Sequence, residues 1–259
     1  MEKIGPKAFI HLDRVQSNFE KIQKIVGDRE ILSVVKANAY GHGAIEIAKV
    51  ISNFKNSKLA VFSFGEAIQL RSSDIKNDII IFSKMQPEFV DLAVKNNIII
   101  NLSSIEDIKI LKDYKSKTNN CPRYHIKFDT GMTRLGIDIK DSNLLYEKII
   151  KDLAIHPEGI YTHFSTADEG DLSYAHMQLK KFKGVVEMAE KYNIQFKYVH
   201  SSNSGAILNL EESYFNMIRV GMLLYGALPS NEVPNNIDIE PTMSFCGSIV
   251  NLRRVPKGT

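Results

Sequence analysis

The sequence predicts an α/β protein whose main part is a (β/α)8 barrel of the TIM type. Short apolar segments of strand length alternate with segments of helical period, which is typical of βα units and a parallel sheet. Eight such strands are expected, and the 259 residues are close to the roughly 250 that barrels of this kind take. These observations together predict a closed barrel.

The expected barrel strands are runs of mainly apolar residues, such as "ILSVVK" and "DIIIF". They cover residues 31–36, 58–63, 78–82, 98–101, 123–128, 155–163, 196–200 and 216–220. Helices are expected between most of them, over residues 44–54, 65–71, 87–95, 105–115, 143–151 and 174–192. Pro87 suits the first turn of one helix, and Ser104 with Asp107 forms a capping pair before another.

Both ends of the chain differ from the barrel pattern. "KAFIHLD", residues 7–13, predicts an extra strand before the first βα unit. After Gly226 a Pro/Asn-rich linker, "PSNEVPNNIDIEP", leads into "MSFCGSIVNLRRV", which predicts a long strand. We therefore expect residues 1–13 to belong with a second β domain, residues 14–228 to form the barrel, and residues 229–259 to be a linker and the first part of that β domain, left incomplete.

The composition excludes several classes of protein. The 33 basic and 30 acidic residues nearly cancel, and no long run of like charge predicts binding to nucleic acid or to a membrane. Two cysteines, Cys121 and Cys246, provide no disulfide framework and are expected to be passive. No apolar run approaches the roughly 18 residues of a membrane span, so a soluble cytoplasmic protein is expected.

Polar side chains follow the expected strands at the point where each strand ends. Catalytic residues of such barrels lie at this carboxyl-terminal rim. Lys36, Asn38 and Tyr40 stand at or after the end of the first strand, and Lys127, Asp129 and Arg134 at or after the fifth. His163 stands at the end of the sixth strand, and Ser201, Ser202, Asn203 and Ser204 follow the seventh. Arg219, which precedes Gly221, stands in the eighth. The sequence thus predicts one catalytic rim.

The chemistry of this rim suggests a cofactor. "SSNSGA" opens an expected helix and Gly221 follows the last strand, and free backbone N–H groups at such positions suit a phosphate. A lysine in the same barrel mouth, Lys36, could form a Schiff base with a carbonyl compound. Phosphate, aldehyde and lysine together suggest pyridoxal 5'-phosphate. The alternative for "SSNSGA" alone is an ordinary helix cap.

Five sequence blocks carry a resemblance to a known family. "SVVKANAYGHG", "KFDTGMTRLGI", "YTHFSTADE", "SSNSGA" and "NMIRVGMLLYG" resemble, in the same order, the conserved blocks of alanine racemases, which are fold-type III pyridoxal-phosphate enzymes. The likeness extends from about Phe9 to the end of the chain. Related decarboxylases share the "KAN" core, so the specificity lies in the five blocks together.

The resemblance implies roles for individual residues. Lys36 would bind the cofactor covalently and act as one of two catalytic acid–bases, on the D-alanine side. Arg134 would approach the phenolic oxygen of the cofactor and the carboxylate of the substrate, and Lys127 matches a lysine that is N-carboxylated in many family members. The residues implied around the phosphate are Tyr40, Ser204, Gly221 and Met222.

Arg219 is the residue that indicates the type of reaction. The resemblance implies that Arg219 faces the pyridine nitrogen of the cofactor, with His163 behind it. An arginine donates a hydrogen bond without giving up its proton, so the ring would stay a poorer electron sink. That favours racemisation over decarboxylation, because the related decarboxylases place a carboxylate there. A surface salt bridge is the alternative for Arg219.

Several candidate residues have plainer alternatives. His163 could bind a metal ion with Asp168 and Glu169, but no second histidine stands at ligand spacing, so no metal site is expected. Lys127 could simply pair with a carboxylate, either Asp129 or Glu158. His42 is expected to be a loop contact, and Phe62 and Phe64 are expected to pack beside a strand end.

The resemblance breaks at the second acid–base. Racemisation moves a proton from one face of the α-carbon to the other, so Lys36 needs a partner on the opposite face. In alanine racemases this is a tyrosine from the C-terminal β domain of the partner subunit, and the sequence stops at Thr259, before the position where we expect it. We therefore expect a homodimeric parent that supplies D-alanine for cell-wall peptidoglycan, and a truncated chain that is impaired by itself.

Three other functions remain open from the sequence. A single-barrel pyridoxal-phosphate protein acting in cofactor homeostasis would need no second domain, but the blocks "GMTRLG" and "THFSTADE" do not favour it. A Schiff-base aldolase without cofactor would carry its lysine on a later strand than Lys36. A decarboxylase would not carry Arg219.

Overall fold

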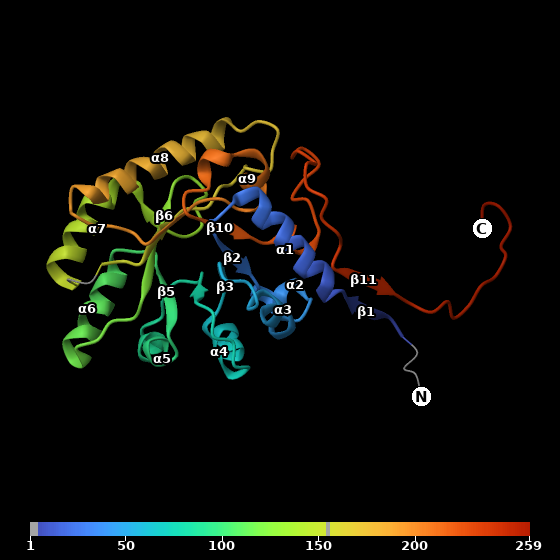
Figure 1. Cartoon of the computed structure of the whole chain (residues 1–259), viewed down its shortest axis with the longest axis horizontal. Coiled ribbons are helices and arrows are strands. Elements are labelled where there is room, and N and C mark those ends of the chain that lie inside the picture. Colours follow the sequence, from blue (N-terminus) through green and yellow to red (C-terminus); the bar gives the residue numbers. More distant parts are fainter. Residues whose placement is uncertain (1–4, 154–155) are drawn as a thin grey trace.

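The computed structural model describes residues 5–153 and 156–259. Its main part is a nearly closed barrel in which parallel strands follow one another in the order β10-β2-β3-β4-β5-β6-β8-β9. Their bounds are β2 (Glu30–Val34), β3 (Ser57–Val61), β4 (Ile79–Ile81), β5 (Ile98–Leu102), β6 (Tyr124–Asp129), β8 (Gly159–Tyr161), β9 (Tyr198–His200) and β10 (Met217–Val220). The predicted barrel is confirmed (Figure 1).

The barrel closes between its last strand and the residues after β9. No β-ladder joins β9 to β10 within the described residues, but the backbone N–H of Arg219 donates to the carbonyl of Ser202 at 3.0 Å. The Asn216 side-chain oxygen also accepts from the Val199 N–H at 2.8 Å. The closure thus brings the loops after β9 and β10 together.

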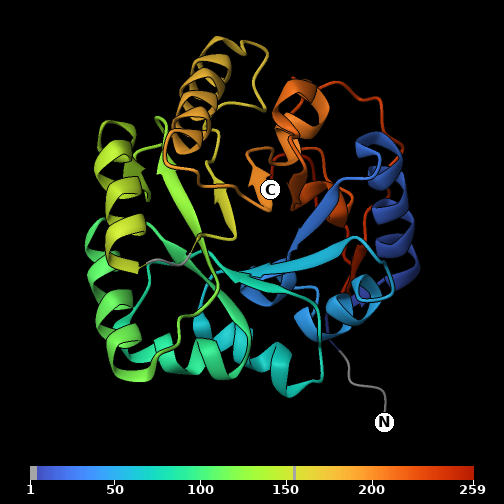
Figure 2. The ribbon, with the colours of Figure 1, turned by 60° about the vertical axis from the view of Figure 1, so that its left-hand side comes forward.

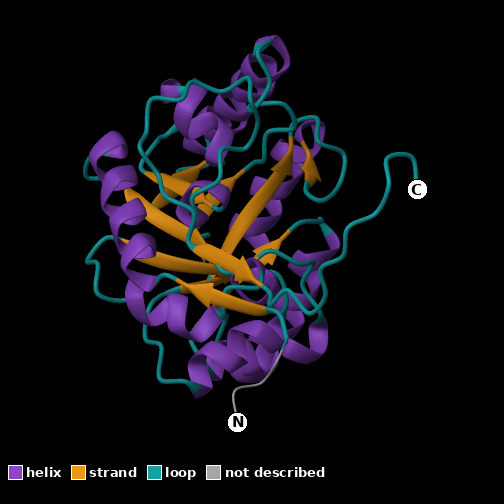
Figure 3. Cartoon of the chain, turned by 90° about the vertical axis from the view of Figure 1, so that its right-hand side faces the viewer, coloured by secondary structure: helices purple, strands orange, loops and turns teal. Residues whose placement is uncertain are grey.

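The helices lie outside the strands, as Figure 2 and Figure 3 show. The α-helices are α1 (Leu12–Val26), α2 (Lys36–Tyr40), α3 (Ala44–Ile51), α4 (Phe64–Ser72), α5 (Val90–Lys95), α6 (Glu106–Thr118), α7 (Ser142–Lys148), α8 (Ser173–Glu190) and α9 (Ser204–Asn209). The other elements are short: β7 (Ile137–Asp138), the 3-10 helices η1 (Pro87–Phe89), η2 (Ile139–Asp141), η4 (Glu211–Ser213) and η5 (Met222–Tyr225), and the π-helix η3 (Ile149–Leu153). None of the described helices is both long and apolar enough to cross a membrane.

Burial explains why the strands are apolar on both faces. Leu32, Ala60, Ile80 and Ile99 alternate with neighbours on their strands and pack together inside the barrel. Their neighbours on the strands, Ile31 among them, pack outward against the helices. Both faces of these strands are therefore shielded from water, as is usual for parallel strands. Such burial favours continuous apolar runs over an alternating pattern.

The strands expected over residues 7–13 and 155–163 are each several residues shorter in the structure. The strand predicted over residues 7–13 ends at Ile10 in β1 (Lys7–Ile10), and helix α1, which the sequence analysis did not predict, begins at Leu12. Val15, Phe19, Ile22 and Val26 recur at helical spacing on the buried face of α1. The strand predicted over residues 155–163 begins outside the described residues, and its described part is confined to β8.

The two ends of the chain form a separate ribbon. β1 pairs antiparallel with β11 (Met243–Cys246), so that Lys7 lies opposite Cys246 and Ile10 opposite Met243. The long strand predicted over residues 243–255 is wrong beyond Cys246, because β1 offers only four residues for pairing. The chain after Cys246 extends away from the body in Figure 1, and Leu252 is 88% exposed.

The segment leading to β11 is held against the barrel. The Asn18 amide donates to the Glu240 carbonyl at 2.8 Å and accepts from the Glu240 N–H at 2.9 Å. Gly226 has a φ of 77°, and a Cβ there would lie 1.9 Å from the Glu240 oxygen. A glycine is therefore required at position 226, where two chain segments cross in contact.

Candidate active site

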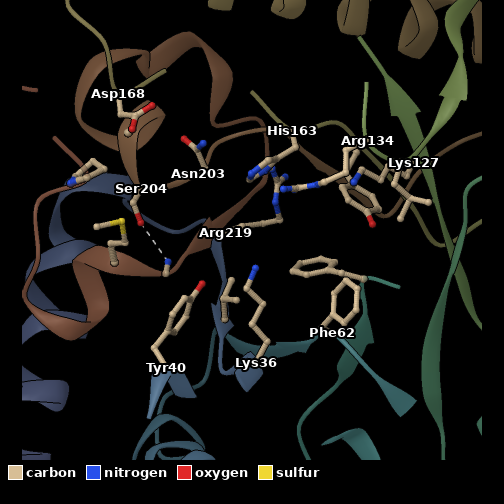
Figure 4. Close-up of a pocket in the computed structure, with 18 residues that line it drawn as sticks. Lys36, Tyr40, Phe62, Lys127, Arg134, His163, Asp168, Asn203, Ser204 and Arg219 are labelled. Carbon is tan, nitrogen blue, oxygen red and sulfur yellow. Dashed lines mark hydrogen bonds between the residues drawn. The ribbon is translucent and has the colours of Figure 1, made fainter. Parts of the chain in front are cut away.

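A cavity of about 450 Å³ opens at the carboxyl ends of the barrel strands. Side chains from loops that are distant in the sequence converge on it (Figure 4). It is lined by the nine residues to which the resemblance assigns roles: Lys36, Tyr40, Lys127, Arg134, His163, Ser204, Arg219, Gly221 and Met222. Of the other polar residues predicted on the rim, Asn203 lines the cavity, whereas Asn38, Asp129, Ser201 and Ser202 do not. The barrel topology thus brings together residues that are separated by up to 186 positions in the sequence (from Lys36 to Met222).

Lys36 stands directly before a turn of unusual backbone conformation. The predicted strand over residues 31–36 ends at Val34, and the chain then turns through Ala37, Asn38 and Ala39 with φ of 52–54° and ψ of 46–49°. Tyr40 also has a positive φ, 53°. Left-handed backbone costs about 1–2 kcal/mol for each residue with a side chain, so other contacts must hold this turn.

The turn is held partly by its own hydrogen bonds. Ala39 N–H donates to the Val35 carbonyl at 2.9 Å, and the Asn38 side-chain oxygen accepts from Ala44 N–H at 2.9 Å. Gly41 and Gly43, with φ of 88° and 92°, lead from the turn into α3. Nothing in the residue types of "KANAY" indicates a left-handed turn.

The Lys36 amine is shifted toward its reactive form. Burial and the nearby Arg134 guanidinium lower its pKa, and the Glu66 carboxylate partly opposes them. The amine lies 5.9 Å from the centre of the Tyr40 ring, and no described carboxylate forms an ion pair with it. A lysine with a lowered pKa has a larger neutral fraction at neutral pH, which is what attack on a carbonyl requires.

Lys127 is the second amine of the cavity. It is 6% exposed, and burial, reinforced by Arg219, Arg134 and Lys36, lowers its pKa to about 8. Neither carboxylate proposed as its partner pairs with it in the described structure: Asp129 accepts from the N–H groups of Gly131 and Thr133, and Glu158 binds Arg123 at 2.6 Å. The simple ion-pair alternative for Lys127 is therefore wrong.

Arg219 is buried without a carboxylate beside it. Its Nη2 donates to the carbonyls of Thr162 and Ser201, each at 2.8 Å, and to Nδ1 of His163 at 3.1 Å, while Nη1 donates to Nδ1 of His200 at 3.3 Å. Burial lowers its pKa to about 10, so the guanidinium remains protonated at neutral pH. The surface salt bridge considered for Arg219 is excluded, since the residue is 3% exposed.

Three histidine rings are linked to Arg219 by hydrogen bonds, His163 and His200 directly and His125 through His200. Because an arginine only donates, His163 and His200 accept at Nδ1 and carry their protons on Nε2. His200 then donates to Nδ1 of His125 at 2.9 Å, and both rings are fully buried. Neither His200 nor His125 was predicted from the sequence as a residue of the site. His163 thus contacts Arg219 and also lines the cavity, and His200 is a second ring bonded to Arg219.

The part of the cavity beside the Tyr40 hydroxyl is lined by small residues, Ser204 and Gly221 among them. Ser204 Oγ accepts from Gly221 N–H at 3.2 Å, and Asn203 caps α9 by accepting from Ala206 N–H at 3.0 Å. A Cβ on Gly221 would come within 3.1 Å of the Tyr40 hydroxyl oxygen. Glycine at position 221 thus leaves room for the Tyr40 phenol beside Ser204.

Other lining residues were not predicted or were given other roles. Phe62, expected to pack beside its strand, is 55% exposed and lines the cavity, whereas Phe64 is buried and stacks on Phe89. Asp168 lines the cavity, and no three His, Cys, Asp or Glu side chains of the described residues are grouped as metal ligands. The remaining unpredicted lining residues are Val34, Phe82, Leu135, Tyr161, Gly205 and Pro229.

The charges in the cavity suit an anionic ligand. Four cations, Lys36, Lys127, Arg134 and Arg219, face a single lining carboxylate, that of Asp168. A ligand that carries a phosphate or a carboxylate would offset this excess. The apolar rings of Phe62 and Phe82 also line the cavity, which thus combines charged groups with apolar surface, as binding sites for small molecules commonly do.

Comparison with known proteins places these features in one family. The family model described as "Alanine racemase, N-terminal domain" matches residues 10–229. The chain is 36% identical to "Alanine racemase 2" of Caldanaerobacter subterraneus subsp. tengcongensis, over 96% of this chain and 65% of that protein. It is 37% identical to an alanine racemase of Halothermothrix orenii, over 97% of this chain and 67% of that protein. It thus spans about two thirds of these relatives.

Solved structures of alanine racemases are similar to this chain over nearly its whole length. The alanine racemase of Clostridium difficile 630 in complex with cycloserine superimposes with a TM-score of 0.88 at 31% identity, covering 95% of this chain and 68% of that chain. The alanine racemase of Bacillus anthracis with bound L-Ala-P gives a TM-score of 0.86 at 30% identity, covering 95% and 64%.

Proposed function

Because the chain belongs to the alanine racemase family, we propose that it serves the interconversion of L- and D-alanine with pyridoxal 5'-phosphate as cofactor. The observation that carries the proposal is the Lys36 amine, whose pKa is lowered, in a cavity whose other end is formed by Ser204 and Gly221. We further propose that the protein acts in the cytoplasm as a homodimer and supplies D-alanine for peptidoglycan. Sedimentation analysis tests the dimer.

The residues present fit this cofactor. Pyridoxal phosphate, when bound, supplies an aldehyde that condenses with amines and a ring that withdraws electrons from the α-carbon of an amino acid. Lys36 would hold it at the aldehyde. The Gly221 N–H, Ser204, Tyr40 and Met222 would surround its phosphate, where Ser204 and Gly221 already share a hydrogen bond. Arg219 would donate toward its ring nitrogen.

Arg134 and Lys36 would have different roles toward the substrate: Arg134 would bind its carboxylate, and Lys36 would transfer its α-proton. Arg134 lines the cavity and has no hydrogen bond or ion pair to any described residue, so its guanidinium is available for a carboxylate. Lys36, once neutral, would take or return a proton on one face of the α-carbon. Arg219 cannot give up its own proton at neutral pH, which supports racemisation over decarboxylation.

Lys127 is proposed to carry an N-carboxyl group. With a pKa of about 8, roughly a tenth of its amines are neutral at pH 7, and only the neutral amine captures CO2. The anion formed would face Arg134 and Arg219, which now lower the pKa of Lys127 by repulsion. We expect a carbamate signal in the 13C NMR spectrum of protein equilibrated with 13C-bicarbonate. The signal should grow from pH 7 to pH 9 and be absent in Lys127→Ala.

The outer segments are proposed to belong to a second domain. Residues 14–228 would form the cofactor-binding barrel, while residues 1–13 and 229–259 would belong with a β domain. The pairing of β1 with β11 supports this division, and limited proteolysis tests it. The second acid–base of racemisation would come from that domain of a partner subunit, so the 259-residue chain alone is proposed to racemise alanine poorly.

One experiment tests both parts of the proposal. The chain is titrated with pyridoxal phosphate, and D-alanine and L-alanine are then incubated separately in D2O with the loaded chain. We expect a visible absorbance band, and loss of the α-proton of D-alanine at least about tenfold faster than that of L-alanine, with little change of chirality. Proton exchange is followed by NMR and chirality by chiral chromatography.

The outcomes separate the alternatives. No band with a folded chain would favour an aldolase that uses no cofactor. A band without exchange of either enantiomer would favour a protein of cofactor homeostasis. Racemisation at the rate of the longer relatives would show that the 259 residues need no partner residue on the second face.

A further inference from the structure

Glu66 connects two loops of the candidate site. It lies near the start of α4, and its Oε2 accepts from the N–H groups of Phe62 and Ser63 at 2.8 and 2.9 Å. Its Oε1 accepts from the N–H of Ala37 at 2.5 Å, which is the first peptide N–H after Lys36. One carboxylate therefore joins the loop after β3 to the left-handed turn after β2.

The second of these contacts is not needed for capping the helix. Ser63 and Glu66 form a complete capping box, in which Ser63 Oγ accepts from Glu66 N–H at 3.3 Å and the carboxylate returns to Ser63 N–H. The bond to Ala37 is additional and goes to another element, 29 residues earlier in the chain. It uses the oxygen that the capping box leaves free.

The turn needs this external acceptor. The hydrogen bonds within the turn use the N–H groups of Ala39 and of Gly41, while the Ala37 N–H has no backbone acceptor among the described residues. Ala37 is also the first of five consecutive residues with positive φ, of which only the last, Gly41, is a glycine. The Glu66 carboxylate therefore fixes the peptide plane between Lys36 and the first strained residue, and with it the direction of the lysine side chain.

The carboxylate is charged when it does this. Burial raises the pKa of Glu66, but the hydrogen bonds from Ser63, Ala37 and Phe62 outweigh burial, so the pKa is lowered overall. Glu66 also acts on the amine, whose pKa it raises against the effects of burial and of Arg134. The other titratable or charged groups that line the cavity with Lys36 are Tyr40, Lys127, Arg134, Tyr161, His163, Asp168 and Arg219.

We infer that Glu66 is a positioning residue for Lys36: its carboxylate, anchored on α4, holds the left-handed turn that directs the amine into the cavity. This rests on the proposed function of Lys36 as the cofactor-binding lysine. Glu66 touches neither the cavity nor a reacting atom, so its effect passes through the backbone of Ala37 and through its charge.

The test compares Glu66→Gln with Ser63→Ala in the full 259-residue chain. A glutamine can turn its carbonyl oxygen to Phe62 and Ser63 and keep the cap, but its NH2 group then faces the Ala37 N–H, donor against donor. Ser63→Ala weakens the same cap and leaves the bond to Ala37 intact. Each chain is titrated with pyridoxal phosphate, and the adduct is trapped with borohydride and located by mass spectrometry.

We expect Glu66→Gln to weaken binding of pyridoxal phosphate at least about tenfold at alkaline pH, where the Lys36 amine is neutral in every variant. Ser63→Ala should stay within about twofold of the parent. The pH at which half of the band forms should also fall in Glu66→Gln, because the anion that raises the Lys36 pKa is gone, and stay unchanged in Ser63→Ala.

Other results would overturn the inference. Folded Glu66→Gln that binds within about twofold of the parent, or Ser63→Ala that loses as much as Glu66→Gln, would show that the link to Ala37 does not position the lysine. If Glu66→Gln does not fold, Glu66→Asp replaces it: its shorter carboxylate keeps the charge, so binding should weaken without a shift in pH. A parent chain without a Lys36 adduct would refute the proposed function itself, and the inference with it.

Discussion

Exchanging Lys36 for alanine is expected to abolish the visible absorbance band with pyridoxal phosphate and to lower α-proton exchange of D-alanine at least about 10³-fold. In the proposed function, Lys36 supplies both the amine that binds the aldehyde and the base that moves the proton. Alanine keeps the backbone N–H and carbonyl at position 36, so the turn and the Glu66 bond to Ala37 should survive. Absorbance titration and proton NMR measure the two effects.

Lys127→Ala provides the matched control. Both lysines line the same cavity and both have a lowered pKa, so the pKa alone does not identify the one that binds the aldehyde. Lys127 lies on β6, 5.7 Å from the centre of the Tyr161 ring, whereas Lys36 lies beside Tyr40. We expect Lys127→Ala to keep the band. Loss of the band in Lys127→Ala and its survival in Lys36→Ala would show that Lys127, and not Lys36, binds the aldehyde.

Arg219→Met should lower the free energy of unfolding by about 3 kcal/mol. Methionine fills much of the same volume but donates nothing, so the carbonyls of Thr162 and Ser201 and Nδ1 of His163 and His200 lose their donor. Arg219→Lys keeps a charge and some of these bonds and should lose less. Chemical denaturation of the three proteins gives the comparison.

The same variant should change how the histidines titrate. Burial and the Arg219 cation hold the pKa of His163 well below its usual value, and the same two causes act first on His200. Without the cation, both pKa values should rise, which NMR of the imidazole protons measures. Because the unfolded histidines bind protons first, the parent loses stability as the pH falls below about 6.5, and Arg219→Met should lose less of it. Unchanged histidine pKa values would mean that Arg219 does not control this chain of rings.

The barrel could be predicted from the sequence because parallel strands buried on both faces leave a clear pattern. The runs around Ile31, Ile79 and Ile98 contain little besides apolar residues. The same topology predicts where the polar residues meet, since the ends of parallel strands share one rim. Helix α1 was missed because the alternation in "KAFIHLD" continues past Ile10 and hides the helical spacing that starts at Leu12.

The parts of the site that could not be predicted depend on contacts across the barrel. "KANAY" contains no glycine, so its left-handed conformation is imposed by partners such as Glu66, which stands on another βα unit. His125 and His200 belong to ordinary strand patterns, and their rings meet across β8, where Gly159 has no side chain to fill the space beside the His125 ring. Nδ1 of His125 lies 2.9 Å from Nε2 of His200. The buried guanidinium of Arg219 likewise draws its acceptors from two separate segments, Thr162 with His163 and His200 with Ser201.

The ribbon of β1 and β11 has a mechanical consequence. Lys7 and Cys246 face each other at its outer end, so tension applied to the two ends of the chain loads the ladder one rung at a time, as in a zip. Unzipping needs little force compared with shearing all rungs at once. The next contacts are the bond from the His11 N–H to the Thr242 carbonyl and, beyond it, those by which Asn18 and Arg14 hold Glu240 and Pro241. Tension on the two ends of the chain would therefore open the ribbon first and the contacts of Glu240 and Pro241 second. Only then would it reach the barrel strands that carry the candidate site.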